Sequence, residues 1–176
     1  MIVTPTKLAG VVTIDLTPAG DARGFFARAF SVSEMTAFGL ATAIAQTGVS
    51  WNATAGTVRG MHYQEGADGE AKYVRCTAGR VHDVVVDLRP GSPTYRAWIA
   101  TELSAANRRQ LFIPPGCAHG FQTLDDDTEV FYLLSHEHRP ARDRGARWDD
   151  PAFGIAWPLR CRVISPRDAA WPDHTG

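Results

Sequence analysis

Two histidines that lie far apart in the chain could share one catalytic pocket. His62 falls within the segment RGMHYQ, and His119 falls within IPPGCAHGFQ. An imidazole, whose ordinary pKa is about 6.5, can take up a proton near neutral pH. Arg59 and Lys72 flank His62 with positive charge, which suits an anionic substrate or an oxyanion that develops during a reaction. His62 is therefore a candidate general base, although an isolated histidine in a strand is more often a structural group.

A tyrosine and an arginine elsewhere in the chain extend this chemistry. Tyr132, in EVFYLL, shares one face of a predicted strand with Val130 and Leu134, because side chains alternate along a strand. A phenol that faces the interior could donate a proton, but a tyrosine between apolar residues is usually part of a core. Arg23, in DARGFF, could bind a phosphate group through two parallel hydrogen bonds. Residue types alone do not decide whether Tyr132 is a proton donor or a core residue.

The spacing Pro-x-Gly-x-x-His around His119 is typical of cupin-type β-barrels, many of which hold a metal ion. Such a site commonly needs a second histidine two positions after the first, and Gln64 stands there instead. An amide oxygen is a poor substitute for imidazole at a transition metal, so His119 would have at most one good nitrogen partner. We therefore expect no metal and no cofactor, with a metal-dependent cupin as the less favoured alternative.

Short runs of β-branched and aromatic residues, separated by turn signals, must position these side chains. The predicted strands cover residues 73–77, 81–88, 98–103, 111–114, 120–124, 129–135 and 161–165. One short helix is predicted near Ser31, which forms a capping box with Glu34, and Gly39 can end it. Residues 137–154 are expected to wrap the surface before the last strand. The pattern predicts an all-β, cupin-type jelly-roll barrel with short peripheral helices.

Length and composition narrow the class of protein. The 176 residues fit one compact domain, residues 1–176, and a net charge of −1 argues against a nucleic-acid partner. No basic leader or long apolar run is present, so neither secretion nor membrane insertion is expected. The three cysteines, Cys76, Cys117 and Cys161, form no disulfide or metal-binding pattern, and are expected to be small buried residues. A cytoplasmic location follows from these features.

Seven segments, taken in chain order, resemble the dTDP-4-dehydrorhamnose 3,5-epimerase family. They are DARGFFAR, GTVRGMHYQ, AKYVRCTAGRVHDVVVDLRPGSPTY, NRRQLFIPPGCAHGFQTL, EVFYLLS, RGARWDDPAFGIAWP and VISPRDAAWP. They run from about residue 21 to residue 172, which is nearly the whole chain. The resemblance implies a metal-free jelly roll, usually a homodimer, that acts on a nucleotide-linked 4-keto-6-deoxyhexose.

The resemblance also implies a role for each candidate residue. His62 matches the general base, Asp168 the carboxylate that supports it, and Tyr132 the acid on the opposite face of the sugar. Lys72 matches the cation near the C4 oxygen. The positions that match pocket or substrate contacts are His119 with Asp83, and Arg23, Gln46, Arg59, His138 and either Ser50 or Asn52.

Three departures from the family pattern fall at substrate-binding positions. Members commonly have Asp-Asn where this chain has Thr47 and Gly48, and often have glutamate at the place of Arg28. His138 takes the place of a tyrosine expected near the nucleotide base. The reaction type is therefore better defined than the sugar, and epimerisation at C3 alone or C5 alone stays open. A sugar-nucleotide 3,4-ketoisomerase and a non-catalytic sugar-nucleotide-binding barrel are the alternatives.

Overall fold

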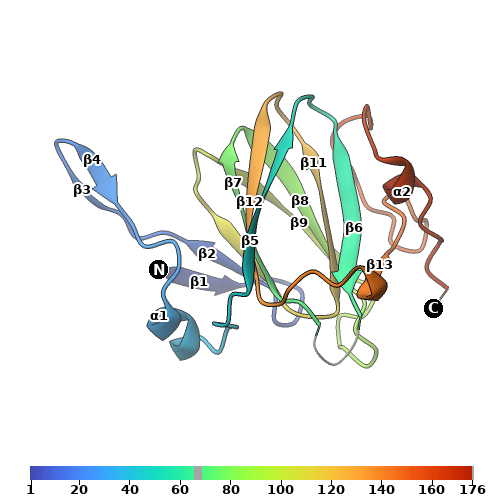
Figure 1. Ribbon diagram of the computed structural model, residues 1–176, viewed down its shortest axis with the longest axis horizontal. Helices are drawn as coiled ribbons and strands as arrows, with labels where there is room; N and C mark the ends of the chain where they lie inside the picture. The colour runs from blue at the N-terminus through green and yellow to red at the C-terminus, as the bar shows by residue number, and fades with distance from the viewer. Residues whose placement is uncertain (66–68, 176) are drawn as a thin grey trace.

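Two antiparallel sheets pack face to face in the computed structural model, which describes residues 1–65 and 69–175 (Figure 1). The six-stranded sheet has the order β1 (Ile2–Pro5), β2 (Val12–Asp15), β10 (Gln110–Ile113), β7 (Lys72–Ala78), β12 (Thr128–Leu134) and β5 (Gln46–Asn52). The five-stranded sheet has the order β13 (Asp143–Gly145), β6 (Val58–Gln64), β11 (Cys117–Thr123), β8 (Arg80–Asp87) and β9 (Trp98–Ser104). Neighbouring strands are mostly not consecutive in the chain, as the predicted jelly-roll barrel requires.

Side-chain alternation builds the core between the two sheets. Along β8, Val81 and Val85 enter the central cluster, whereas Val84 and Val86 point to the opposite face. The central cluster joins both sheets through residues that include Val74, Leu111, Phe121 and Val130. Asp83 lies between Val81 and Val85 in the same alternation, so its carboxylate is carried into the interior with 0% of its surface exposed. The candidate polar residues are thus placed at one end of an apolar interior.

The outer face of each sheet is also covered. Met35 of helix α1 (Val32–Ala37) packs with Tyr73 and Phe112 on the six-stranded sheet. Phe153 and Trp157, from the segment that follows β13, pack with the outward side chains of the five-stranded sheet. Helix α2 (Pro166–Ala169) lies beside β6, and a two-stranded hairpin of β3 (Ala19–Asp21) and β4 (Gly24–Phe26) projects away from the sandwich (Figure 1).

The first six predicted strands are confirmed with boundaries shifted by a few residues, but the seventh is wrong. Residues 161–165 make only an isolated parallel bridge between Val163 and Thr57. Val163 accepts a hydrogen bond from the Val58 N–H, and the chain then turns into α2 at Pro166, which leaves no room for a longer ladder. The expected surface segment, residues 137–154, contains a 3₁₀ turn (Pro140–Arg142) and the short strand β13.

The helix near Ser31 is confirmed, but the prediction of a capping box is wrong. Ser31 is the N-cap residue and makes no side-chain capping bond. The Glu34 carboxylate instead pairs with the Met1 ammonium and with Arg28, each at 2.9 Å, because full positive charges compete successfully with a backbone N–H. Gly39 has the expected positive φ of 69° just after the helix.

Two further expectations concern cysteines and membrane insertion. Cys76 and Cys117 are buried as expected, but Cys161 is only partly buried, and all three are free thiols. Across residues 1–65 and 69–175, no helix is long and apolar enough to cross a membrane.

Candidate active site

The closest pair of candidate catalytic groups is His62 and Asp168, which are 106 positions apart in sequence. Strand β6 carries His62, and Asp168 comes from α2, whose N-cap Ser165 accepts a hydrogen bond from the Asp168 N–H at 3.0 Å. Asp168 Oδ1 lies 2.8 Å from His62 Nε2. The carboxylate is 7% exposed and the imidazole 39%, so the pair has a buried inner end and an accessible outer end.

The environment of Asp168 keeps its carboxylate ionised. Burial alone would raise the pKa of Asp168, but hydrogen bonds from His62, the Gly60 N–H and Ser165 hold that pKa below its ordinary value. An ionised carboxylate can only accept hydrogen bonds, so the proton between the two groups must lie on His62 Nε2. His62 Nδ1 is then the unprotonated nitrogen. The pair can therefore act as a general base through Nδ1.

Gly60 allows this arrangement because it lacks a side chain. Its φ is 131°, and a Cβ there would lie 2.5 Å from the Gly120 Cα on β11. The close approach of the two strands lets the Gly60 N–H reach Asp168 Oδ2 at 3.2 Å. It also sets His62 and His119 directly opposite each other as register partners on neighbouring strands. The two distant sequence motifs thus meet through a pair of glycines.

Trp171 packs over this strand pair and fixes the position of α2. Its ring lies against Gly145, which is the register partner of His62 on β13. The His62 and Trp171 ring centroids are 6.5 Å apart, and the Arg167 guanidinium lies 5.3 Å from the indole centroid. The indole therefore bridges the strand that carries the base and the helix that carries its carboxylate.

A Cβ at position 145 is expected to disturb this packing. In Gly145→Ala, the added methyl would overlap the Trp171 indole, so α2 and Asp168 must shift. We expect a loss of about 1–3 kcal/mol in unfolding free energy, typical of overpacking, together with a lower kcat. Denaturant unfolding and steady-state kinetics measure both effects. In a Trp171→Ala background the same substitution should cost less, and an equal cost in both backgrounds would contradict the proposed overlap.

Lys72 reaches the same pocket from the six-stranded sheet. Its Nζ lies 3.3 Å from the His62 carbonyl oxygen and 3.5 Å from Glu70 Oε2. Only 11% of the side chain is exposed. Burial lowers the pKa of Lys72, and the neighbouring Glu70 carboxylate opposes this effect. The structure thus places a buried lysine amine next to the candidate base.

A second histidine–carboxylate pair lies deeper between the sheets. His119 Nε2 is 2.9 Å from Asp83 Oδ2, and these side chains are 5% and 0% exposed. The Tyr132 ring, on β12 of the opposite sheet, lies 6.1 Å from the His119 ring at an angle of 75°. Burial raises the pKa of the Tyr132 hydroxyl, and the nearby Asp83 carboxylate raises it further. Tyr132 therefore remains a neutral phenol that can donate a proton.

Predicted substrate contacts lie on the inward face of β5 and on β6, which belongs to the opposite sheet. Arg59 Nε donates to Asn52 Oδ1 at 2.7 Å, and the Asn52 amide donates to the Ser50 and Thr128 carbonyl oxygens. Gln46, at the start of β5, accepts a hydrogen bond from the His138 N–H at 3.2 Å. Gln46 and His138 line the same cavity as His62. Ser50 and Asn52 lie farther along β5.

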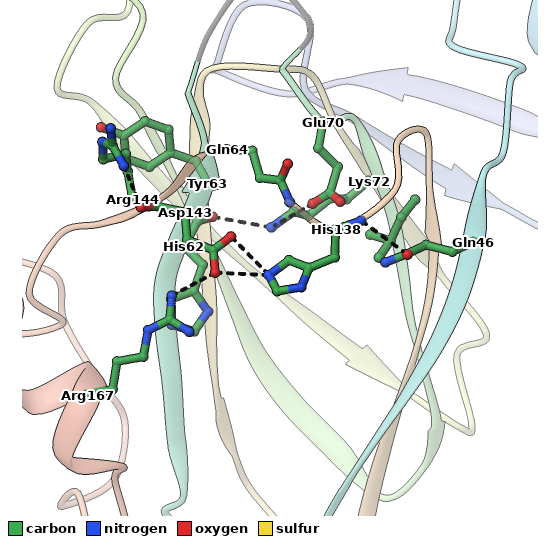
Figure 2. Close-up of a pocket in the computed structure, with 11 residues that line it drawn as sticks. Gln46, His62, Tyr63, Gln64, Glu70, Lys72, His138, Asp143, Arg144 and Arg167 are labelled. Atoms are coloured by element: carbon green, nitrogen blue, oxygen red, sulfur yellow. Dashed lines mark hydrogen bonds and ion pairs between the residues drawn. The ribbon is translucent and has the colours of Figure 1, made fainter. Parts of the chain in front are cut away.

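The sequence analysis missed part of the pocket wall. Figure 2 shows Asp143 between the His138 ring and the Arg167 guanidinium, at 2.9 Å and 2.8 Å. Burial alone would raise the pKa of Asp143, but hydrogen bonds from Arg167 and His138 hold it below its ordinary value. A cavity of about 210 Å³ lies in front of these groups, and its remaining polar lining includes Gln64, Glu70 and Arg144. The only hint in the sequence was that Arg167 immediately precedes Asp168.

Arg23, unlike Gln46, Lys72 and His138, does not line this pocket. It lies in the β3–β4 hairpin, pairs with Asp21 at 2.5 Å, and has 90% of its side chain exposed. Figure 1 shows this hairpin pointing away from the barrel. Arg23 cannot contact a ligand near His62 of the same chain in this conformation.

Potential metal ligands do not cluster in the described part of the chain. Across 1–65 and 69–175, no three histidine, cysteine, aspartate or glutamate side chains form a group that could hold a metal ion. His62 and His119 each have Nε2 within hydrogen-bonding distance of a carboxylate.

Comparison with known proteins places this geometry in context. The model of the dTDP-4-dehydrorhamnose 3,5-epimerase family matches residues 5–175. A dTDP-4-dehydrorhamnose 3,5-epimerase of Sinorhizobium fredii is 43% identical over 167 residues, which are 94% of this chain and 86% of that protein. A dTDP-4-dehydrorhamnose 3-epimerase of Streptomyces niveus is 38% identical over 169 residues, which are 96% of this chain and 81% of that protein.

A solved structure agrees with both the fold and the family. The crystal structure of a dTDP-4-dehydrorhamnose 3,5-epimerase from Bacillus anthracis, with TDP and PPi bound, superposes with a TM-score of 0.94. It is 35% identical, and the superposition covers 98% of this chain and 99% of that one. Because the family model and these relatives cover nearly the whole chain, the protein belongs to the dTDP-4-dehydrorhamnose 3,5-epimerase family of isomerases.

Proposed function

We propose that the protein epimerises a nucleotide-linked 4-keto-6-deoxyhexose, with dTDP as the expected nucleotide, at C3, C5 or both. The observation that carries this proposal is the placement of base and acid on opposite sheets. His62 comes from β6 of the five-stranded sheet, and Tyr132 comes from β12 of the six-stranded sheet. A sugar ring held between the sheets would present one face to each residue, which is what inversion of a carbon centre requires.

The ketone of such a sugar makes the neighbouring protons removable. C3 and C5 both flank the C4 carbonyl, so loss of either proton gives an enolate whose charge lies on the C4 oxygen. His62 Nδ1 is the proposed proton acceptor, and the Asp168 carboxylate stabilises the imidazolium that forms. Lys72 is the proposed partner of the enolate oxygen, and one well-placed donor of this kind contributes about 3 kcal/mol.

Tyr132 is the proposed proton donor on the opposite face. Its raised pKa keeps the phenol neutral until the enolate forms, and the proton then passes to carbon. His119 and Asp83 are proposed to bind the sugar, since His119 Nε2 is held by Asp83 and its Nδ1 is left for a ligand. Arg59 is proposed to bind the diphosphate, and the remaining contacts are assigned to Gln46, Ser50, Asn52 and His138.

Incubation with dTDP-4-keto-6-deoxyglucose in D₂O, followed by proton NMR, tests this proposal. Deuterium at both C3 and C5 with inverted configuration is the result expected of a double epimerase. Deuterium at one carbon would restrict the reaction to that carbon, as the name of the Streptomyces niveus relative indicates for C3 in that protein. A product with its carbonyl at C3 would identify a ketoisomerase instead. Binding of the nucleotide sugar without exchange would support a non-catalytic barrel.

We also infer that two chains pair so that the β3–β4 hairpin of one reaches the pocket of the other. Arg23, predicted to bind substrate, is exposed on this hairpin, and its neighbours Phe25 and Phe26 are 48% and 71% exposed. Val49 and Trp51 on the edge strand β5 are 62% and 58% exposed, although Trp51 would be expected to pack. Apolar side chains at a sheet edge and on a projecting arm suit a symmetric dimer interface.

Mixing two inactive variants distinguishes a hairpin that acts on its partner from one that acts on its own chain. Arg23→Ala and His62→Ala should each impair turnover as pure proteins. In a mixed dimer with the hairpin exchanged, one site receives both an intact Arg23 and an intact His62, so activity is expected to recover partly. No recovery, in a mixture shown to exchange subunits, would contradict the exchanged arrangement. Analytical ultracentrifugation of the wild type measures the dimer itself.

Cytoplasmic location and a single catalytic domain belong to the same proposal. Three free thiols suit a reducing compartment, and the central cluster draws residues from both sheets. Fractionation of cells that express the chain would test the location.

A further inference from the structure

Glu70 is a buried acidic residue in the pocket that the proposed mechanism does not use. It lies just before β7, only 8% of its surface is exposed, and it lines the same cavity as His62 and Lys72. Its Oε2 is 3.5 Å from the Lys72 Nζ, and Figure 2 shows the two side chains next to each other on one wall. A carboxylate in such a place is costly to bury without a partner, so its pairing with Lys72 calls for a function.

We propose that Glu70 is a positioning residue that keeps Lys72 in its cationic ammonium form and directs that ammonium toward the C4 oxygen of the substrate. The inference rests on the proposed function, because it concerns the partner of the enolate oxygen. Within residues 1–65 and 69–175, the Lys72 Nζ contacts two acceptors, the His62 carbonyl oxygen and Glu70. An ammonium has three N–H donors, which leaves one for a ligand.

The electrostatics of the cavity explain why Lys72 needs a carboxylate partner. Burial lowers the pKa of Lys72, whereas Glu70 raises it through both its charge and a hydrogen bond. The other described titratable groups around this cavity are His62 and Tyr63 on β6, Asp83 on β8, Asp143 and Arg144 on β13, Arg167 on α2, and His138 after β12. Asp143 is already bound to His138 and Arg167, and Asp83 to His119. Glu70 is the carboxylate in direct contact with Lys72.

The consequence can be measured in the alkaline part of the pH profile. Only the ammonium form stabilises an enolate, so activity should fall as pH rises through the pKa of Lys72. Removing the charge of Glu70 removes an effect that raises this pKa, so the pKa falls further. In Glu70→Gln the alkaline limb of kcat is therefore expected to move to lower pH by about one pH unit or more, as for an opposite charge at this distance.

Two measurements on Glu70→Gln test the proposal, with Glu65→Gln as the matched control. Glu65 is a neighbouring carboxylate that is 59% exposed and pairs with Arg144 at 2.8 Å, so its substitution should leave the alkaline limb in place. The first measurement is kcat against pH. The second is competitive acetylation of Lys72 against pH, followed by mass spectrometry, which reports its protonation without turnover. In Glu70→Gln, the alkaline limb of kcat and the acetylation curve of Lys72 are both expected to shift to lower pH. In the control, neither curve is expected to shift.

Several results would overturn the assignment. If the pH dependence of Lys72 acetylation is the same in Glu70→Gln as in the wild type, the proposal is wrong, whatever happens to kcat. An equal loss of kcat at every pH, without a labelling shift, would show that Glu70 is only structural. If Glu70→Gln does not fold, Glu70→Asp withdraws the charge by one methylene and should shift both curves in the same direction by less. Failure of the proposed function can be distinguished from failure of this inference. In that case the wild-type protein would show no turnover, but acetylation of Lys72 would still change in Glu70→Gln.

Discussion

Replacing His62 with alanine is expected to lower the rate of product formation by about 10²–10⁴-fold, the usual contribution of a positioned general base. In the wild type, Asp168 holds the proton on Nε2 and leaves Nδ1 free to accept the C3 or C5 proton. His138 also pairs with a carboxylate in this cavity, but its partner Asp143 is shared with Arg167, whereas Asp168 pairs with His62. The rate is measured by proton NMR of the sugar under single-turnover conditions.

The control for His62→Ala is ligand binding. Because the substitution removes the base and leaves Arg59, Asn52 and Gln46 in place, affinity for dTDP by calorimetry should change little. Loss of turnover with retained binding assigns the defect to chemistry. Turnover that stays within a few-fold of the wild type would rule out His62 as the base and direct attention to His119.

The pairing of His62 with Asp168 illustrates what physical reasoning from sequence can and cannot predict. The 106 positions between them are bridged only by folding, so periodicity and spacing gave no sign of the contact. Resemblance to the family placed both residues at one site. The structure adds the cause, which is that Gly60 brings β6 close to β11 while Ser165 starts a short helix that turns Asp168 inward.

The strands were predicted well where β-branched residues are concentrated, and poorly where they are few. Strand β8 carries four valines and was evident from composition. Strand β5, QTGVSWN, alternates in the opposite sense, with its polar residues inward toward the pocket and Val49 and Trp51 outward. A strand that places its apolar face on the outside does not look like a core strand in the sequence. The same inversion would suit β5 to the proposed substrate contacts and to the proposed pairing with a second chain.

The pocket wall was the least predictable part of the site. Asp143 and Arg167 come from short, charged segments whose composition is typical of a surface loop, and neither segment has a hydrophobic period. Their meeting depends on β13 pairing with β6 and on Trp171 fitting against Gly145. His138 joins Asp143 from only five residues earlier in the chain, whereas Arg167 reaches Asp143 from 24 residues further on.

Tyr132 should have a different effect from His62, because the two residues are proposed to act on opposite faces of the sugar. The base alone can remove a proton and return it to the face from which it came. Inversion needs a second group that supplies the proton from the other sheet. The rate of solvent exchange and the rate of inversion therefore report on different residues, and a single reaction in D₂O measures both.

Tyr132→Phe is expected to reduce inversion by about 10²-fold or more while deuterium continues to enter the unreacted sugar with its configuration retained. The phenylalanine ring can still pack against His119 and the central cluster, so only the proton donor is lost. Tyr95→Phe is the matched control, because the Tyr95 hydroxyl bonds to His174 outside the pocket lining and its removal should change neither rate. If exchange and inversion fall by the same factor in Tyr132→Phe, the residue supports proton removal or binding, and another group must protonate the second face.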